Sequence, residues 1–133
     1  MSLSLGTGAD TLTSGSGADS ITAGNGGNTI NAGDGNDTVI AGTGVDNISL
    51  GNGNDRVTFA NTRLTSSDTV DGGAGTNTLY FSNQSTLADA DLTKVTNIQT
   101  IDGAVANNTI GLGAKALAAG IVTINGAAAA NET

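Results

Sequence analysis

Five aspartates in the first half of the chain recur at multiples of nine residues, and their type and spacing suit the binding of a cation. They are Asp10, Asp19, Asp37, Asp46 and Asp55, with Asn28 in place of an acid at one position of the series. Each follows a Gly-x-Gly motif, which frees the backbone to adopt positive φ angles and to turn its carbonyls toward a common centre. The paired glycines are Gly6 and Gly8, Gly15 and Gly17, Gly24 and Gly26, Gly33 and Gly35, Gly42 and Gly44, and Gly51 and Gly53. Carboxylate and carbonyl oxygens, about six to eight together, suit Ca²⁺ better than Mg²⁺, so the series predicts several calcium sites.

An aliphatic residue stands two positions after each member of this series and indicates a short strand. These residues are Leu12, Ile21, Ile30, Val39, Ile48 and Val57. Their mostly small polar neighbours predict three-residue strands, each with one inward side chain. Strands that alternate with glycine turns are typical of a parallel β-solenoid. One nine-residue repeat only reverses the chain direction, so a full coil needs two repeats.

These coils would place the series in two columns, one on each edge of the solenoid. Loops that end at Asp10, Asn28 and Asp46 stack on one edge, and loops that end at Asp19, Asp37 and Asp55 stack on the other. Strands stack about 4.8 Å apart, and carboxylates at that distance repel each other unless a cation lies between them. Because Asn28 removes a carboxylate from the edge that holds Asp10 and Asp46, we expect the edge with Asp19, Asp37 and Asp55 to bind Ca²⁺ more tightly.

Two further aspartates lie close to the repeats. Asp34 occupies the variable position of a Gly-x-Gly motif, where we expect a solvated turn residue rather than a ligand. Asp71 precedes Gly72 and Gly73 in a later copy of the motif. It is a candidate extra metal ligand, and the alternative is a residue that only ends a strand.

The composition excludes several other kinds of protein. The 133 residues include 21 Gly but no Pro, Cys, His or Trp, so disulfides and the usual zinc, haem and iron–sulfur ligand sets are ruled out. A net charge of −8 argues against binding nucleic acid, and no segment is long and apolar enough to predict membrane insertion. Without His or Cys to act near neutral pH, we predict that the chain is not an enzyme. With only 2% aromatic residues, an ordinary packed core would be hard to build, so a regular repeating structure must take its place.

The segment from Gly6 to Thr58 resembles the RTX, or haemolysin-type, calcium-binding nonapeptide repeat G-G-x-G-x-D-x-U-x. The resemblance implies an all-β fold, a right-handed parallel β-roll in which Ca²⁺ lies between adjacent loops on each edge. It also implies an extracellular or cell-surface location reached by type I export, and a virion surface would suit the same chemistry. This chain departs from the pattern in that Ser or Ala replaces the leading Gly in most copies.

The second half of the chain is less regular. The period breaks at 60–67 and resumes at 68–79, where Asn77 replaces the acid and the loop 73–77 is predicted to stack on 51–55. We expect a calcium-binding β-roll over 1–81 and, over 82–133, a continued solenoid without the calcium motif. Strand-like runs at 78–81, 97–101, 108–110 and 121–124 and helical segments at 85–95 and 114–119 predict longer coils with short helical turns. This half resembles the spacer units of bacterial surface-layer and adhesin RTX proteins.

These observations favour a structural calcium-binding protein that folds on Ca²⁺ and associates end to end as a homo-oligomer. The ends at 2–5 and 131–133 lack a recognisable polar cap, and each reads like the junction of one repeat with the next. A calcium-binding fragment of a larger type I-secreted adhesin, surface-layer protein or toxin is the alternative. A third possibility is an ice- or surface-binding face of Thr and Ser, but Ile40 and Arg56 interrupt that array.

Overall fold

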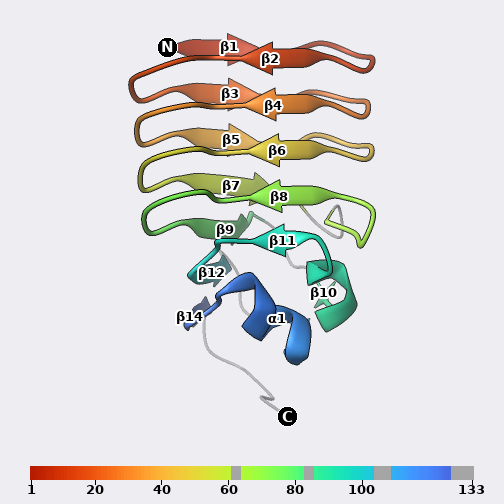
Figure 1. The fold of residues 1–133 in the computed structure, drawn as a ribbon. Coiled ribbons are helices and arrows are strands. Elements are labelled where there is room, and N and C mark those ends of the chain that lie inside the picture. The colour runs from red at the N-terminus through yellow and green to blue at the C-terminus, as the bar shows by residue number, and fades with distance from the viewer. Residues whose placement is uncertain (61–63, 83–85, 104–108, 127–133) are drawn as a thin grey trace.

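The computed structural model is an all-parallel β-solenoid of about five turns, which confirms the predicted fold class. It describes residues 1–60, 64–82, 86–103 and 109–126. Figure 1 shows the coils stacked in chain order, with the helical segments gathered at the C-terminal end. The strands of the regular coils are β1 (Ser2–Ser4), β2 (Thr11–Thr13), β3 (Ser20–Thr22), β4 (Thr29–Asn31), β5 (Thr38–Ile40), β6 (Asn47–Ser49), β7 (Arg56–Phe59), β8 (Thr69–Asp71) and β9 (Thr78–Phe81).

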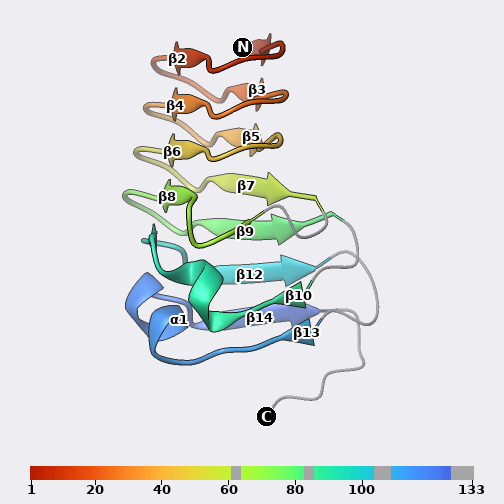
Figure 2. The same ribbon diagram turned by 90° about the vertical axis from the view of Figure 1, so that its right-hand side faces the viewer.

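Two parallel sheets form the faces of the solenoid, and the chain alternates between them. One sheet has the order β1-β3-β5-β7-β9-β12-β14, and the other contains β2, β4, β6, β8 and β11 in that spatial order. Figure 2 shows the strands of the regular coils as two stacks. Ile21 pairs with Val39 and Ile30 with Ile48, each eighteen residues further along the chain. Two repeats therefore make one coil, as the spacing predicts.

The core consists of two rows of side chains from each sheet. The predicted inward aliphatic residue of each strand is buried from the second coil onward, as at Ile21 and Val39, which are both fully inaccessible to solvent. A second buried row comes from the residue two positions after each inward aliphatic residue: Ala23, Ala32, Ala41, Leu50, Phe59 and Phe81. The small residues that replace the leading Gly of the repeat pattern therefore fill the core. The side chains of this row grow from Ala to Leu to Phe along the chain, so both phenylalanines are buried where the coils become longer.

The later coils are longer, as predicted, and carry the helical segments. Arg56 pairs with Thr78 and Thr78 with Thr100, a step of 22 residues, and Thr100 pairs with Thr123, a step of 23. The remaining strands are β10 (Thr86–Leu87), β11 (Val95–Thr96), β12 (Thr100–Gly103), β13 (Thr109–Ile110) and β14 (Thr123–Gly126). The additional residues form the 3-10 helix η1 (Asp89–Leu92) and the helix α1 (Ala114–Ala119).

Helix α1 is held at both ends. The carboxylate of Asp89 accepts hydrogen bonds from the backbone N–H groups of Lys115 and Ala116. Gly120 ends the helix in a left-handed conformation with φ of 89°, as the sequence predicts. Residues 61–63 of the irregular stretch and the repeat-like ending at 131–133 lie outside the described residues.

Candidate metal centre

The glycine loops stack directly on one another along both edges of the solenoid. Thr7 is bridged to Asn25 and Asn25 to Thr43 on one edge, while Ser16, Asp34, Asn52 and Ala74 form the equivalent series on the other. This pairing confirms the predicted division of the loops, and it confirms that 73–77 stacks on 51–55. Most of the repeat glycines have the expected positive φ, but Gly6 and Gly42 do not. Gly42 is needed for another reason, because a Cβ there would overlap the carbonyl oxygen of Gly24.

The aspartates of one edge form a continuous hydrogen-bonded column, called here the first column. The backbone N–H of Asp19 donates to Oδ1 of Asp37 (2.8 Å), and that of Asp37 donates to Oδ1 of Asp55 (2.7 Å). Asp55 donates in the same way to Oδ1 of Asn77 (2.9 Å), and Asn77 to Oε1 of Gln99 (2.7 Å). Each side chain therefore reaches toward the coil before it, and the three carboxylates lie in line.

The second column lies on the opposite edge and contains Asp10, Asn28, Asp46 and Asp68. The backbone N–H of Asp10 donates to Oδ1 of Asn28 (3.1 Å), and that of Asn28 donates to Oδ1 of Asp46 (2.8 Å). Asp46 donates to Oδ1 of Asp68 (2.8 Å). Sequence reasoning missed Asp68 and Gln99 because they follow irregular stretches, although each precedes Thr and an aliphatic residue as Asp37 does.

The five predicted aspartates each have one carboxylate oxygen that is buried without a hydrogen-bond partner. These atoms are Oδ2 of Asp10, Asp19, Asp37, Asp46 and Asp55. An ionised carboxylate out of water is costly unless a cation or donor compensates it. Among the residues that the structure describes, no three acidic side chains converge on one point. The remaining ligands of a bound ion would therefore be loop carbonyls, and such a mixed oxygen set fits Ca²⁺.

Burial makes the charge of the columns unfavourable in the absence of a cation. Removal from water raises the pKa of Asp37, Asp46 and Asp55 above the ordinary value, and the neighbouring carboxylates of Asp19 and Asp37 add to the rise at Asp37 and Asp55 respectively. Hydrogen bonds from the backbone of the preceding coil work against this rise but do not cancel it.

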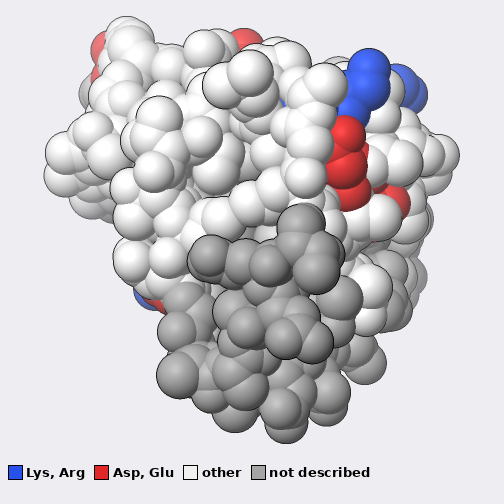
Figure 3. Space-filling view, turned by 90° about the horizontal axis from the view of Figure 1, so that it is seen from below, with Lys and Arg blue, Asp and Glu red and all other residues white. Residues whose placement is uncertain are grey.

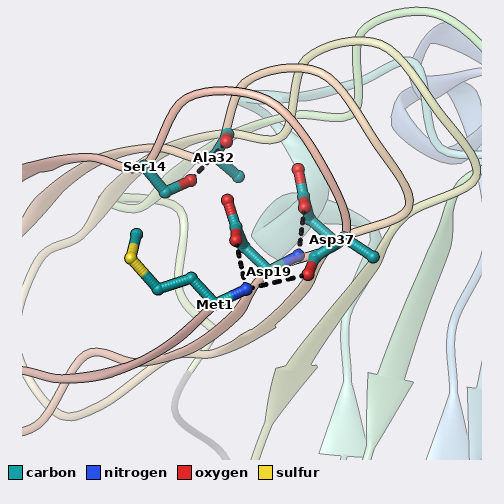
Figure 4. Close-up of polar contacts among 6 residues, drawn as sticks. Met1, Ser14, Asp19, Ala32 and Asp37 are labelled. Carbon is teal, nitrogen blue, oxygen red and sulfur yellow. Dashed lines mark hydrogen bonds and ion pairs between the residues drawn. The ribbon is translucent and has the colours of Figure 1, made fainter.

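Asp19 shows the effect of a positive charge on the same column. The α-ammonium group of Met1 lies 2.7 Å from Oδ1 of Asp19 and donates a further hydrogen bond to the carbonyl of Ala18 (Figure 4). This contact lowers the pKa of Asp19, in the opposite direction to the shift of the next residue in the column, Asp37. Close to a cation, the carboxylate form is therefore favoured.

The two other candidate aspartates lie outside the columns. Asp34 is exposed and accepts a hydrogen bond from the side-chain amide of Asn52 (2.7 Å), in keeping with a turn residue. Asp71 ends β8, where its Oδ1 accepts hydrogen bonds from the backbone of Gly73 (3.0 Å) and the side chain of Asn97 (2.7 Å). These donors lower the pKa of Asp71, so its carboxylate is stabilised within the strand end itself.

A comparison with protein families identifies the repeat. The model of the RTX calcium-binding nonapeptide repeat, in four copies, matches residues 4–39, 22–57 and 65–85, which together make up more than half of the chain. The chain belongs to this family. RTX repeats bind Ca²⁺ and serve as a structural module, and the third matched segment includes Asp68 and Asn77, which extend the columns of the RTX region.

The other comparisons add no relative. No curated protein and no solved structure matched the chain. RTX repeats are typical of secreted proteins. Within the part of the chain that the structure describes, there is no helix long and apolar enough to cross a membrane.

Proposed function

We propose that this chain is a structural module whose RTX region folds when Ca²⁺ binds between the stacked loops of its two edges. The observation that carries this proposal is the set of five buried carboxylate oxygens without partners. The loop glycines and the aspartates of both columns are the proposed binding residues. Within each site, carboxylate oxygens would supply the negative charge and loop carbonyls would complete the coordination.

Calcium binding and folding are coupled in this proposal because the columns exist only in the coiled state. In an unfolded chain the same carboxylates are hydrated and far apart, and no loop carbonyls converge on them. The free energy of ion binding then contributes directly to folding. The core is thin, with one aliphatic and often one Ala side chain from each strand of the early coils, so hydrophobic burial contributes less than in an ordinary domain of this length.

The ends of the solenoid support self-association with a second copy of the chain. β1 and β2 are edge strands of the two sheets, and Leu3 and Leu12 within them and Leu5 directly after β1 are only partly buried. Positions Gly6, Gly8, Gly15 and Gly17 face open space, whereas the equivalent glycines of later coils lie against the coil before them. At the opposite end, seen in Figure 3, the described surface is mostly uncharged, and Leu117 and Val122 are about four-fifths exposed. Edge strands with apolar neighbours favour a further coil over solvent.

We place the function outside the cell, on a bacterial surface, in an extracellular matrix or on a virion, since extracellular calcium would fill sites that cytosolic calcium leaves empty. Membership of a larger secreted adhesin, surface-layer protein or toxin is the alternative, and it predicts a monomer in solution. An ice-binding face receives little support, because Ile40 is exposed and Arg56 stacks on Tyr80 in the middle of the outward rows. A catalytic role has no supporting group in either column.

Circular dichroism tests the coupling of folding to calcium. The protein is freed of metal with a chelator, titrated with Ca²⁺ and, in parallel, with Mg²⁺ at equal ionic strength. We expect β-structure to develop with Ca²⁺ at concentrations where Mg²⁺ has little effect. A β spectrum unchanged by chelation would refute the coupling, and an equal response to Mg²⁺ would refute the assignment of the ion. Light scattering at high Ca²⁺ then tests association, and a strict monomer would refute the end-to-end contact.

A further inference from the structure

We propose that the side-chain amides of Asn28 and Asn77 take the place of a bound cation in their loops and thereby fix which loops of the solenoid need calcium. This inference rests on the proposed function, since it assigns the calcium sites to the remaining loops. At these two positions the chain has an amide where the repeat pattern has an acid. Neither amide then acts as a weak metal ligand; each replaces the metal.

Both branches of the Asn28 side chain make hydrogen bonds. Its Oδ1 accepts the hydrogen bond from the backbone of Asp10, which is the role that Oδ1 has in the aspartates of the columns. The other branch of the side chain, Nδ2, donates to the carbonyl oxygens of Ala23 (3.2 Å) and Gly26 (2.9 Å). Asn28 is almost completely buried, and it ties its own glycine loop together without an ion.

Asn77 repeats this arrangement on the opposite edge. Its Oδ1 accepts from the backbone of Asp55, and its Nδ2 donates to the carbonyl oxygens of Gly72 (2.9 Å) and Asn97 (3.1 Å). Ala23 and Gly72 each lie five residues before their asparagine, so the same loop carbonyl is engaged in both cases. The second carbonyl comes from the same loop at Asn28 and from the next coil at Asn77.

The Asp37 loop lacks an amide donor at this point, and its equivalent carbonyl, that of Ala32, accepts instead from the hydroxyl of Ser14 in the coil before. In Asp37, Oδ1 accepts the backbone hydrogen bond from Asp19, just as Oδ1 of Asn28 accepts from Asp10. Oδ2 then occupies the branch that Nδ2 occupies in asparagine, and it is buried without a partner. An oxygen in that place cannot donate to a loop carbonyl as Nδ2 of Asn28 does. A cation held by Oδ2 and by loop carbonyls would compensate its buried charge.

The fourth residue of the second column is also compensated without an ion. Oδ2 of Asp68 accepts hydrogen bonds from the backbone N–H (2.8 Å) and the hydroxyl (3.0 Å) of Thr65. In the second column, uncompensated aspartates therefore alternate with compensated residues. In the first column Asp19, Asp37 and Asp55 are consecutive and Oδ2 of each lacks a hydrogen-bond partner, although the α-ammonium group of Met1 pairs with Oδ1 of Asp19. Among the residues that the structure describes, adjoining coils that each present an unpartnered carboxylate oxygen occur only between these three loops, which are therefore the proposed calcium sites.

Asn28→Asp tests the inference, with Asn25→Asp as the matched control. Asn25 lies in the same loop but is exposed, and its Oδ1 accepts a hydrogen bond from the Thr43 hydroxyl that a carboxylate can also accept. Both variants add one negative charge to the loop. The folding equilibrium is measured in chelator by circular dichroism in mixtures of urea and trimethylamine N-oxide, which brings weakly folded chains into range. Calcium stoichiometry is measured by equilibrium dialysis.

We expect Asn28→Asp to lower the folding equilibrium constant in chelator by about tenfold or more relative to Asn25→Asp, because an oxygen replaces the donor. Saturating Ca²⁺ should restore its stability at least to that of the control, with one additional ion bound per chain. Asn77→Asp should behave in the same way. Equal folding of Asn28→Asp and Asn25→Asp in chelator would overturn the inference, and so would a loss of stability that Ca²⁺ does not restore. If the wild-type chain bound no Ca²⁺, the proposed function would fail, while the comparison in chelator would still decide the role of the amide.

Discussion

Replacing Asp37 with Asn should have opposite effects on the fold with and without calcium. Asp37 is the middle residue of the first column and is 1% exposed. The substitution keeps an oxygen to accept the hydrogen bond from Asp19 and replaces the unpartnered Oδ2 with a donor. We expect Asp37→Asn to stabilise the calcium-free fold at neutral pH and to weaken calcium binding at the two sites that this residue adjoins.

The size of the stabilisation follows from the cost of the Asp37 charge. Carboxylates separated by the strand spacing of about 4.8 Å repel by about 3.5 kcal/mol at an effective dielectric constant of about 20, and Asp37 has Asp19 and Asp55 as neighbours. The cost has a ceiling, because the carboxyl group can take up a proton instead. With an ordinary pKa of 3.8 in the unfolded chain, that ceiling is about 4 kcal/mol at pH 7. Salt and nearby water reduce it, so we expect a gain of about 1–4 kcal/mol.

The sign of the pH dependence follows from the raised pKa of Asp37. The folded state holds this proton more tightly than the unfolded state, so the calcium-free wild-type fold loses stability as the pH rises from about 3.8 through the raised pKa. Asp37→Asn lacks that loss. Its advantage should be largest at neutral pH and should disappear below about pH 4.

Urea and trimethylamine N-oxide titrations in chelator at pH 7 and pH 3.5 measure this advantage, and calorimetry measures calcium binding. Asp34→Asn is the control, since it removes the same charge from an exposed residue of the same loop. In calorimetry, Asp37→Asn should bind Ca²⁺ at least about tenfold more weakly. An uncompensated charge on Asp37 would be ruled out if Asp37→Asn were no more stable than Asp34→Asn at pH 7 without calcium, or if its advantage were the same at both pH values.

Three further changes should follow from the packing of the solenoid. Ile48→Ala removes a fully buried side chain and should lower the free energy of unfolding in the presence of calcium by about 2–5 kcal/mol. Urea denaturation measures this loss, and a value below about 1 kcal/mol would contradict the placement of Ile48 in the core. Gly42→Ala places a Cβ against the Gly24 carbonyl and should lower the melting temperature more than Thr43→Ala in the same loop. Asp89→Asn weakens the acceptor at the start of α1 and should also lower the melting temperature. Because the pKa of Asp89 is lowered in the fold, its contribution is present above pH 3.8 and is lost as the pH falls further, so wild type and variant should converge in acid.

The repeated part of the structure could be predicted because one small set of interactions recurs in it. The eighteen-residue spacing of Asp19, Asp37 and Asp55, which is twice the nine-residue period, predicted both the coil length and the edge on which each loop lies. Glycine was predictable at the loops, although the reason differs at Gly42, where close approach of two backbones and not a positive φ requires it. The second buried row was not predicted, because Ala23 and its equivalents read as small turn residues.

The rest depended on contacts that sequence spacing does not encode. Asp68 and Gln99 join the columns only because longer coils return to the same register after 22 residues. The role of Asn28 depends on where its Nδ2 points, and a sequence pattern that treats Asn as a weaker Asp cannot distinguish a ligand from a donor.

The most direct test of calcium binding by the stacked loops is a crystal structure of the calcium-loaded protein with anomalous diffraction data. We predict anomalous peaks between the coils of the first column, with Oδ2 of Asp19, Asp37 and Asp55 at calcium–oxygen distances of about 2.3–2.6 Å. Loop carbonyls should complete each coordination shell, and no peak should lie beside Nδ2 of Asn28. Calcium-saturated crystals in which these carboxylate oxygens contact no ion would contradict the proposal.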